Sequence, residues 1–179
     1  MLEGQKTQLD IDRANIRRRL QEDHRARKSK LDQAILLIGR AISELYEDRT
    51  GDFVVDATDS GPEFRITIQG DRGGGISQIE IFCFDLALFS ITTKENRGPG
   101  FLVHDSHLFD GVDERQVAHA LRLGASTATE IGGQYIVTMN SDIFDRLPFS
   151  PEIDRSKIVL PTRLSDRGEA GGLFGFRFD

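Results

Sequence analysis

The sequence has few of the residues that build covalent or multi-ligand sites. Its 179 residues include no tryptophan, two tyrosines, five prolines and one cysteine, Cys83. One cysteine excludes an intrachain disulfide and any zinc site made of several thiolates. No apolar run approaches the roughly 20 residues of a membrane span, and the first residues lack the apolar stretch of a signal peptide. We therefore expect a cytoplasmic protein without a membrane partner.

The phosphate-binding motif GxxxxGK[ST] is also missing, and the sequence contains no Gly-Lys dipeptide. The backbone and the lysine of that motif supply most of the grip on the phosphates of a nucleotide. We therefore expect no tight ATP binding by this chain alone.

Composition and charge suggest a folded chain with two differently charged parts. Hydrophobic residues make up 38% and charged residues 29% of the sequence, which suits one domain with a modest core. The formal net charge is −6, yet residues 1–50 carry 11 basic and 9 acidic side chains and residues 51–179 carry 12 and 20. This shift predicts a helical arm over 1–50 and an acidic α/β lobe over 51–179.

The first part has the periodicity of a long helix. Its apolar residues follow a 4-3-4-3 spacing in Leu31, Ile35, Ile38, Ile42 and Leu45. We predict one helix from about residue 5 to 48, with its C-terminal half packed and its N-terminal half projecting. An ordinary amphipathic helix and the end of a coiled-coil arm both fit this pattern; the polar, basic stretch 21–30 favours the arm.

The second part alternates between strand-like and helix-like segments. We expect a hairpin made by residues 53–57 and 64–68, followed by a buried helix over 76–91. A strand over 101–104, a helix over 113–130 and a strand over 134–139 come next. Further short strand candidates are 157–160 and 173–178. This order predicts an α/β fold with a mostly parallel sheet, flanking helices and the hairpin at its margin.

Two segments carry candidate chemistry. The apolar strand 101–104 runs directly into Asp105, which places a carboxylate at the sheet edge where open α/β sheets bind ligands. Such a carboxylate can hold Mg²⁺ through water. The Gly-rich segment 70–75 precedes the buried helix and is either an anion site at a helix N-terminus or a simple turn.

Taken in order, these parts resemble the C-terminal half of an ABC-type ATPase head of the SMC, RecN and RecF branch. More specifically, IFCFDLALF (81–89), GFLVHDSHLFDGVDERQ (100–116) and LFGFRF (173–178) resemble the YydD-type family. That family is a domain of unknown function at the C-terminus of SMC-like ATPases. The resemblance covers roughly residues 30–179.

The resemblance implies roles for particular residues. Asp105 would be the Walker B aspartate, which coordinates Mg²⁺ via water. The signature loop, which contacts the γ-phosphate of ATP held by an opposing head, would comprise Gly73, Gly74, Gly75 and Ser77. Asp110 and Asp113 would belong to the D-loop at the dimer interface, and Asn140 would be the switch residue that senses the γ-phosphate.

The sequence departs from the family pattern at two positions. Ser106 follows Asp105 where most of these ATPases carry the glutamate that orients the attacking water. Arg72 precedes the glycines, so the Ser-Gly-Gly order of the signature is not clean. Either His107 positions the water instead, or hydrolysis is slow and the nucleotide acts as a switch.

The resemblance also implies partners. Mg²⁺ and ATP would bind only in the complete head, after an N-terminal P-loop lobe of the same parent protein is supplied and two heads form a homodimer. The chain would then be a C-terminal piece of a longer protein or one half of a split ATPase, in a bacterial DNA-linked or defence role. DNA could contact the basic cluster of the arm, which comprises Arg17, Arg18, Arg19, Arg25, Arg27, Lys28 and Lys30.

Three other functions remain open at this point. The chain could be a non-enzymatic dimerisation or adaptor module. It could be a metal-dependent hydrolase that uses His104, Asp105 and His107, although neighbouring strand residues point to opposite faces. A cysteine enzyme based on Cys83 is the weakest alternative, because a thiol on an apolar helix face is usually inert.

Overall fold

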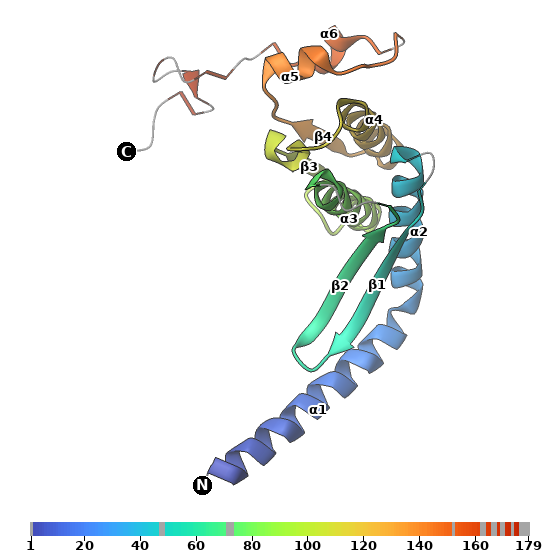
Figure 1. Ribbon diagram of the computed structural model, residues 1–179, viewed down its shortest axis with the longest axis vertical. Coiled ribbons are helices and arrows are strands. Elements are labelled where there is room, and N and C mark those ends of the chain that lie inside the picture. The colour runs from blue at the N-terminus through green and yellow to red at the C-terminus, as the bar shows by residue number, and fades with distance from the viewer. Residues whose placement is uncertain are drawn as a thin grey trace. The chain divides into compact units, whose positions relative to one another are not determined.

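The computed structural model describes residues 2–46, 49–70, 74–151, 153–161, 164–165, 168, 171–172 and 174–175. They divide into two compact units, Met1–Pro148 and Phe149–Asp179. The larger unit contains the elements α1 (Leu2–Ala26), α2 (Lys28–Leu45), β1 (Gly51–Thr58), β2 (Gly61–Ile68), α3 (Gly74–Lys94), β3 (Phe101–His104), the 3-10 helix η1 (Ser106–Phe109), α4 (Glu114–Ile131), β4 (Gln134–Val137) and α5 (Ser141–Arg146) (Figure 1).

The arm is two helices and not the single helix predicted for residues 5–48. Arg27 separates α1 from α2 and has non-helical backbone angles, φ −101° and ψ 13°. The break falls in the polar stretch, where no buried side chain holds the helix straight. The described side chains of α1 are exposed except for half-buried Leu20 and His24, whereas α2 buries Ile38 and Ile42. The predicted contrast between a packed half and a projecting half is confirmed.

The predicted hairpin is confirmed in β1 and β2. The strands pair antiparallel from Gly51 opposite Ile68 to Thr58 opposite Gly61, and Asp59 and Ser60 form the turn. The hairpin contacts both α1 and α2, and it packs on α3 through the rings of Phe53 and Phe64.

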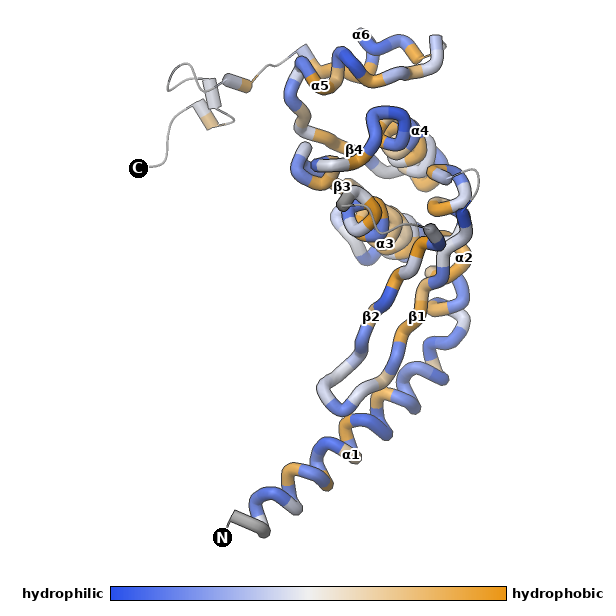
Figure 2. Tube along the Cα trace, in the orientation of Figure 1, coloured by the Kyte–Doolittle hydropathy of each residue, from blue (hydrophilic) through white to orange (hydrophobic). Residues whose placement is uncertain are grey.

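The predicted buried helix is α3, which contacts α2, α4, β3 and η1. Its Ile79, Phe82 and Cys83 are completely buried. The expectation that no apolar run approaches the length of a membrane span is wrong for one segment: among the described residues, the helix over Gly75–Lys94 is long and apolar enough to cross a membrane. A core helix meets the same criterion, and Figure 2 shows that hydrophobic residues concentrate on α3 while α1 is mostly hydrophilic.

The predicted large parallel sheet is wrong. The fold is mixed α/β, and among the described residues there are two sheets of two strands each, the antiparallel β1–β2 and the parallel β3–β4. Helix α4 connects β3 to β4, as the predicted strand–helix–strand order requires. The extent of the sheet was mispredicted because the hairpin strands pair only with each other.

The smaller unit contains α6 (Arg155–Ile158). The strand predicted at 157–160 is therefore wrong. The Asp154 side chain accepts a hydrogen bond from the Ser156 amide (3.1 Å), and this N-cap starts a helical turn. The strand predicted at 173–178 lies outside the described residues apart from Phe174 and Gly175, which belong to no strand.

Candidate functional site

The candidate site lies at the carboxyl edge of the β3–β4 sheet. Both strands end at this edge, where the Thr138 amide donates a hydrogen bond to the His104 carbonyl (3.0 Å). Asp105 follows β3 directly, and Asn140 lies three residues beyond the end of β4. Helix α3 begins beside the loop that follows η1. The fold thus gathers a carboxylate, an amide and a helix N-terminus at one edge.

Asp105 has one carboxylate oxygen committed to local structure. Its Oδ1 accepts a hydrogen bond from the His107 amide (2.7 Å), which makes Asp105 the N-cap of η1. The side chain is exposed, and the described residues provide no hydrogen-bond partner for Oδ2. The backbone therefore fixes the carboxylate while Oδ2 stays available to a ligand.

His107 and Asp110 form an exposed pair in the loop after β3. His107 Nδ1 lies 2.9 Å from Asp110 Oδ2. This hydrogen bond, with the negative charges of Asp105 and Asp110, raises the pKa of His107 above its ordinary value. The pair with Asp110 therefore stabilises the charged form of the ring relative to an isolated histidine.

Asp113 and Asn140 occupy helix N-cap positions. Asp113 Oδ1 accepts hydrogen bonds from the Arg115 amide (2.9 Å) and from Arg115 Nε (3.0 Å), and these bonds lower the pKa of Asp113. Capping α4 is a sufficient structural reason for an aspartate there. Asn140 precedes α5 but makes no side-chain capping bond, so its exposed amide remains available.

The Gly-rich segment has a structural requirement at one position. A Cβ on Gly75 would lie 2.5 Å from the Gly111 carbonyl oxygen and 2.9 Å from Val112 Cα. Only glycine lets α3 approach this loop so closely. Gly74 begins α3 and Ser77 is exposed on it, whereas Gly73 lies outside the described residues. Packing thus accounts for Gly75 without reference to a phosphate.

His104 faces away from the exposed edge. Its ring is buried, with Nδ1 3.0 Å from the Tyr135 hydroxyl and Nε2 3.3 Å from Asp85 Oδ2. Strand alternation sends His104 inward and Asp105 outward. His104, Asp105 and His107 therefore do not converge, and the described residues contain no cluster of three His, Cys, Asp or Glu side chains that could hold a metal.

Asp85 and Tyr135 are the residues that our sequence analysis missed. Asp85 interrupts the apolar run of the buried helix, and Tyr135 is one of only two tyrosines. An isolated carboxylate in such a run indicates a polar partner within the core. Its partner, His104, comes from another element and could not be identified from spacing alone.

Cys83 has the environment of an inert packing residue. The side chain is completely buried on α3. Burial, with a smaller contribution from the charge of Glu80, raises the pKa of the thiol to about 12. A thiolate nucleophile is therefore disfavoured.

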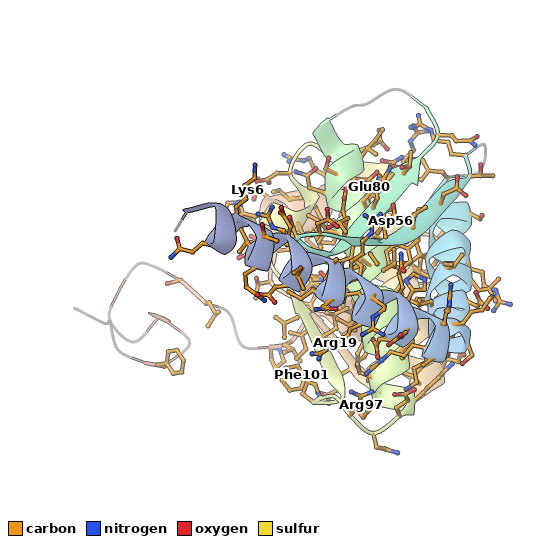
Figure 3. All side chains as sticks on the ribbon, turned by 90° about the horizontal axis from the view of Figure 1, so that it is seen from below. Lys6, Arg19, Asp56, Glu80, Arg97 and Phe101 are labelled. Carbon is orange, nitrogen blue, oxygen red and sulfur yellow. The ribbon has the colours of Figure 1, made fainter. Side chains whose placement is uncertain are left out.

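Among the residues that the structure describes, one apolar face of the β3–β4 sheet is exposed. In the parallel register, Phe101 pairs with Gln134 and Val103 pairs with Ile136, and these four side chains point to the same face. Phe101, Val103 and Ile136 are 47%, 50% and 39% exposed. Phe101 of this exposed face is labelled in Figure 3. The opposite face contains His104 and Tyr135, which contact the rings and polar groups of α3.

Five of the seven residues in the basic cluster of the arm form ion pairs with acidic side chains. Ion pairs join Arg17 to Asp59, Arg18 to Glu22, Arg27 to Asp23, Lys28 to Asp32 and Lys30 to Glu95. Exposed pairs of this kind contribute little to stability but reduce the local positive charge. No ion pair involves Arg19 or Arg25 among the described residues (Figure 3 labels Arg19).

Comparisons with known proteins give a family and, among solved structures, a partial likeness to an Smc head domain. The model of a family described as "uncharacterised protein conserved in bacteria (DUF2326)" matches residues 41–178. The Smc head domain of Pyrococcus furiosus, solved with an extended coiled coil and bound to the C-terminal domain of ScpA, aligns with a TM-score of 0.48 and 16% identity. The alignment covers 64% of this chain and 30% of that chain. None of the curated proteins matches the chain.

Proposed function

The chain belongs to the DUF2326 family of uncharacterised bacterial proteins, and we propose that it is the C-terminal lobe of an SMC-like, ABC-type ATPase head. This lobe contributes the signature-like segment, the Walker B aspartate and the D-loop. It hydrolyses ATP only after a P-loop lobe joins it. The uncovered apolar face of β3–β4 is the observation that carries the proposal.

A two-stranded parallel sheet with one bare apolar face is an incomplete structure. Parallel sheets occur almost only where both faces are covered, and two strands alone are marginally stable in water. Phe101, Val103 and Ile136 form the bare face, so a helix from another segment is expected to cover it. A further parallel strand can add at an edge of the sheet. A P-loop lobe supplies both a strand and a helix.

The nature of the missing lobe follows from what the carboxyl edge has and lacks. It has Asp105, the N-terminus of α3 and the amide of Asn140. It lacks a phosphate-binding lysine, because the sequence has no GxxxxGK[ST] motif. The two lobes are therefore chemically complementary: one holds the phosphates and the other contributes the carboxylate for the metal.

Asp105 suits a shared magnesium site. Mg²⁺ is usually held by one or two carboxylates together with substrate phosphates and water, so a single available Oδ2 is enough. When bound, the ion would neutralise charge on the phosphates. In the proposed head, the hydrogen bond from the His107 amide keeps the Asp105 carboxylate oriented. Gly75 and Ser77 at the start of α3 face the opposing nucleotide. Asn140 senses the γ-phosphate.

The loop after Asp105 favours slow turnover. Ser106 stands where a general base is expected, and the Nδ1 atom of His107 is already hydrogen-bonded to Asp110. ATP would then act mainly as a switch that joins and separates two heads across Asp110 and Asp113. We place this switch in a bacterial DNA-linked or defence process, with Arg19 and Arg25 as the arm's available phosphate contacts.

A docking module without hydrolysis is the second candidate. The bare face of β3–β4 supports it equally, because binding another lobe requires no chemistry. The two candidates differ in whether Asp105 is needed for nucleotide turnover after the lobes have joined.

The docking step can be tested with a pair of matched substitutions. The segment of the parent gene that carries the P-loop is co-expressed with wild-type chain, Val103→Asp or Val54→Asp. Val103 and Val54 are 50% and 42% exposed, and Val54 lies on the hairpin. We expect Val103→Asp to weaken association at least tenfold and Val54→Asp to leave it unchanged. Equal binding by both variants would show that the bare face is not the docking surface.

A further inference from the structure

A chain of three polar side chains lies next to the candidate site, with the His104 ring buried at its centre and the Asp85 side chain 33% exposed. Tyr135 from β4, His104 from β3 and Asp85 from α3 are joined at 3.0 and 3.3 Å. The three residues therefore connect three elements through one imidazole ring. The rings of Phe82 and Tyr135 also pack against His104.

With His104 as a neutral imidazole, the following arrangement of protons satisfies every group in this chain. The Asp85 carboxylate can only accept, so His104 Nε2–H donates to it. His104 Nδ1 is then an acceptor, and the Tyr135 hydroxyl donates to it. Burial raises the pKa of Tyr135, which keeps that hydroxyl protonated as a donor. The direction of donation thus runs from Tyr135 through His104 to Asp85.

His104 is the last residue of β3, and Asp105 follows it directly along the backbone. The His104 carbonyl accepts the Thr138 amide, which fixes the strand ends together. The next residue is Asp105, whose Oδ1 caps η1. Because the two residues are consecutive, a shift of the His104 backbone would displace the Asp105 carboxylate.

We propose that Asp85 and Tyr135 are positioning residues for Asp105, acting through His104 from α3 and β4. An apolar residue at position 104 would fill the same space, but it would not be oriented by hydrogen bonds from two sides. The relevance of this positioning to catalysis rests on the proposed ATPase function, whereas the positioning itself can be measured on the chain alone.

Amide hydrogen exchange provides the direct measurement. The Asp105 carboxylate protects the His107 amide, and the Asp113 carboxylate protects the Arg115 amide with the same i, i+2 geometry. Tyr135→Phe removes one hydroxyl that bonds to His104. Since a net hydrogen bond corresponds to roughly a two- to tenfold change in an equilibrium constant, we expect exchange at His107 to accelerate about two- to tenfold and exchange at Arg115 to stay constant.

Tyr46→Phe is the matched control. Tyr46 is the other tyrosine; it is buried, and its hydroxyl bonds to the Gln116 side chain and not to His104. This variant should change neither amide. Asp85→Asn retains an acceptor for His104 Nε2–H and should resemble wild type at His107, whereas Asp85→Leu should resemble Tyr135→Phe. Unchanged exchange at His107 in Tyr135→Phe, or equal acceleration at both amides, would overturn the proposal.

Turnover in the completed head separates this proposal from the proposed function. If the head hydrolyses ATP in an Asp105-dependent manner, Tyr135→Phe should lower kcat by a similar factor and leave KM for ATP within about twofold. An unchanged kcat would contradict the positioning role in catalysis. If the wild-type head shows no Asp105-dependent hydrolysis, the ATPase function fails, and the exchange measurement still decides whether Asp105 is positioned.

Discussion

Replacing Gly124 with alanine should destabilise the protein, whereas replacing Gly39 with alanine should stabilise it. Gly124 is buried in α4, where the ring of Tyr135 lies against it; a Cβ there would overlap Tyr135 Cε1 and Cδ1. Gly39 lies within α2, and a Cβ there would meet no atom within 4 Å. Replacing an interior helical glycine with alanine gains about 1 kcal/mol of stability where space permits. Gly39→Ala should therefore stabilise the protein by about that amount.

Gly124→Ala gains the same helix propensity but must displace a packed aromatic ring. Overpacking of this kind costs roughly 1–3 kcal/mol. The net result should be a loss of about 1 kcal/mol, so the two variants should differ by about 2 kcal/mol. At about 2–4 °C per kcal/mol for a chain of this size, their melting midpoints should differ by roughly 4–8 °C. Thermal unfolding followed by circular dichroism gives both values. If Gly124→Ala is as stable as Gly39→Ala, the described packing of α4 against Tyr135 is incorrect.

Three further predictions concern titratable groups. NMR titration should give a pKa of His107 above its ordinary value, and this pKa should fall in Asp110→Asn but not in Glu114→Gln. Because the pair with Asp110 favours the charged ring, it stabilises the folded protein at low pH, and this stabilisation disappears as the pH rises through the folded-state pKa of His107. Cys83 should react with a thiol reagent at pH 8 only after denaturation, because burial raises its pKa to about 12; rapid labelling of the native chain would contradict its packing role. Asp113→Ala should cost about 1 kcal/mol at neutral pH through loss of the α4 N-cap. Since the folded-state pKa of Asp113 is lowered, this difference should shrink as acidification passes that pKa, and a pH-independent cost in denaturant titrations would exclude the ionised cap.

Local pattern was sufficient to predict the elements that form the site. The apolar segments around Phe82, Val103 and Ile136 correspond to α3, β3 and β4, and the position of Asp105 at the end of a strand follows from the change in residue type. These features depend on neighbouring residues, so periodicity detects them. The hairpin was predicted for the same reason, since its turn residues lie between two β-rich runs.

Features that depend on distant partners could not be predicted. Strand-like sequences indicate that strands exist but not which edges pair, and the sheet was therefore expected to be larger. The break at Arg27 lies among good helix formers, and only the absence of packing distinguishes it. The segment containing Ile158 is apolar and β-branched, but the Asp154 cap makes it a helical turn.

The candidate site also combines features formed by near neighbours in the sequence with features that depend on distant residues. The cap made by Asp105 and the pair of His107 with Asp110 involve near neighbours, although the sequence predicted a metal ligand, a water-positioning residue and a D-loop residue at these positions. The links from His104 to Asp85 and Tyr135 span 19 and 31 residues. No spacing rule connects those positions until the fold is known.

The central claim is that this chain supplies one lobe of a nucleotide-dependent head. Calorimetric titration of Mg-ATP into two samples tests it most directly: the chain alone, and the chain co-expressed with the P-loop segment of its parent. The account predicts binding only in the second sample and its loss on Asp105→Ala. Tight binding by the chain alone, or the absence of binding in both samples, would contradict the claim.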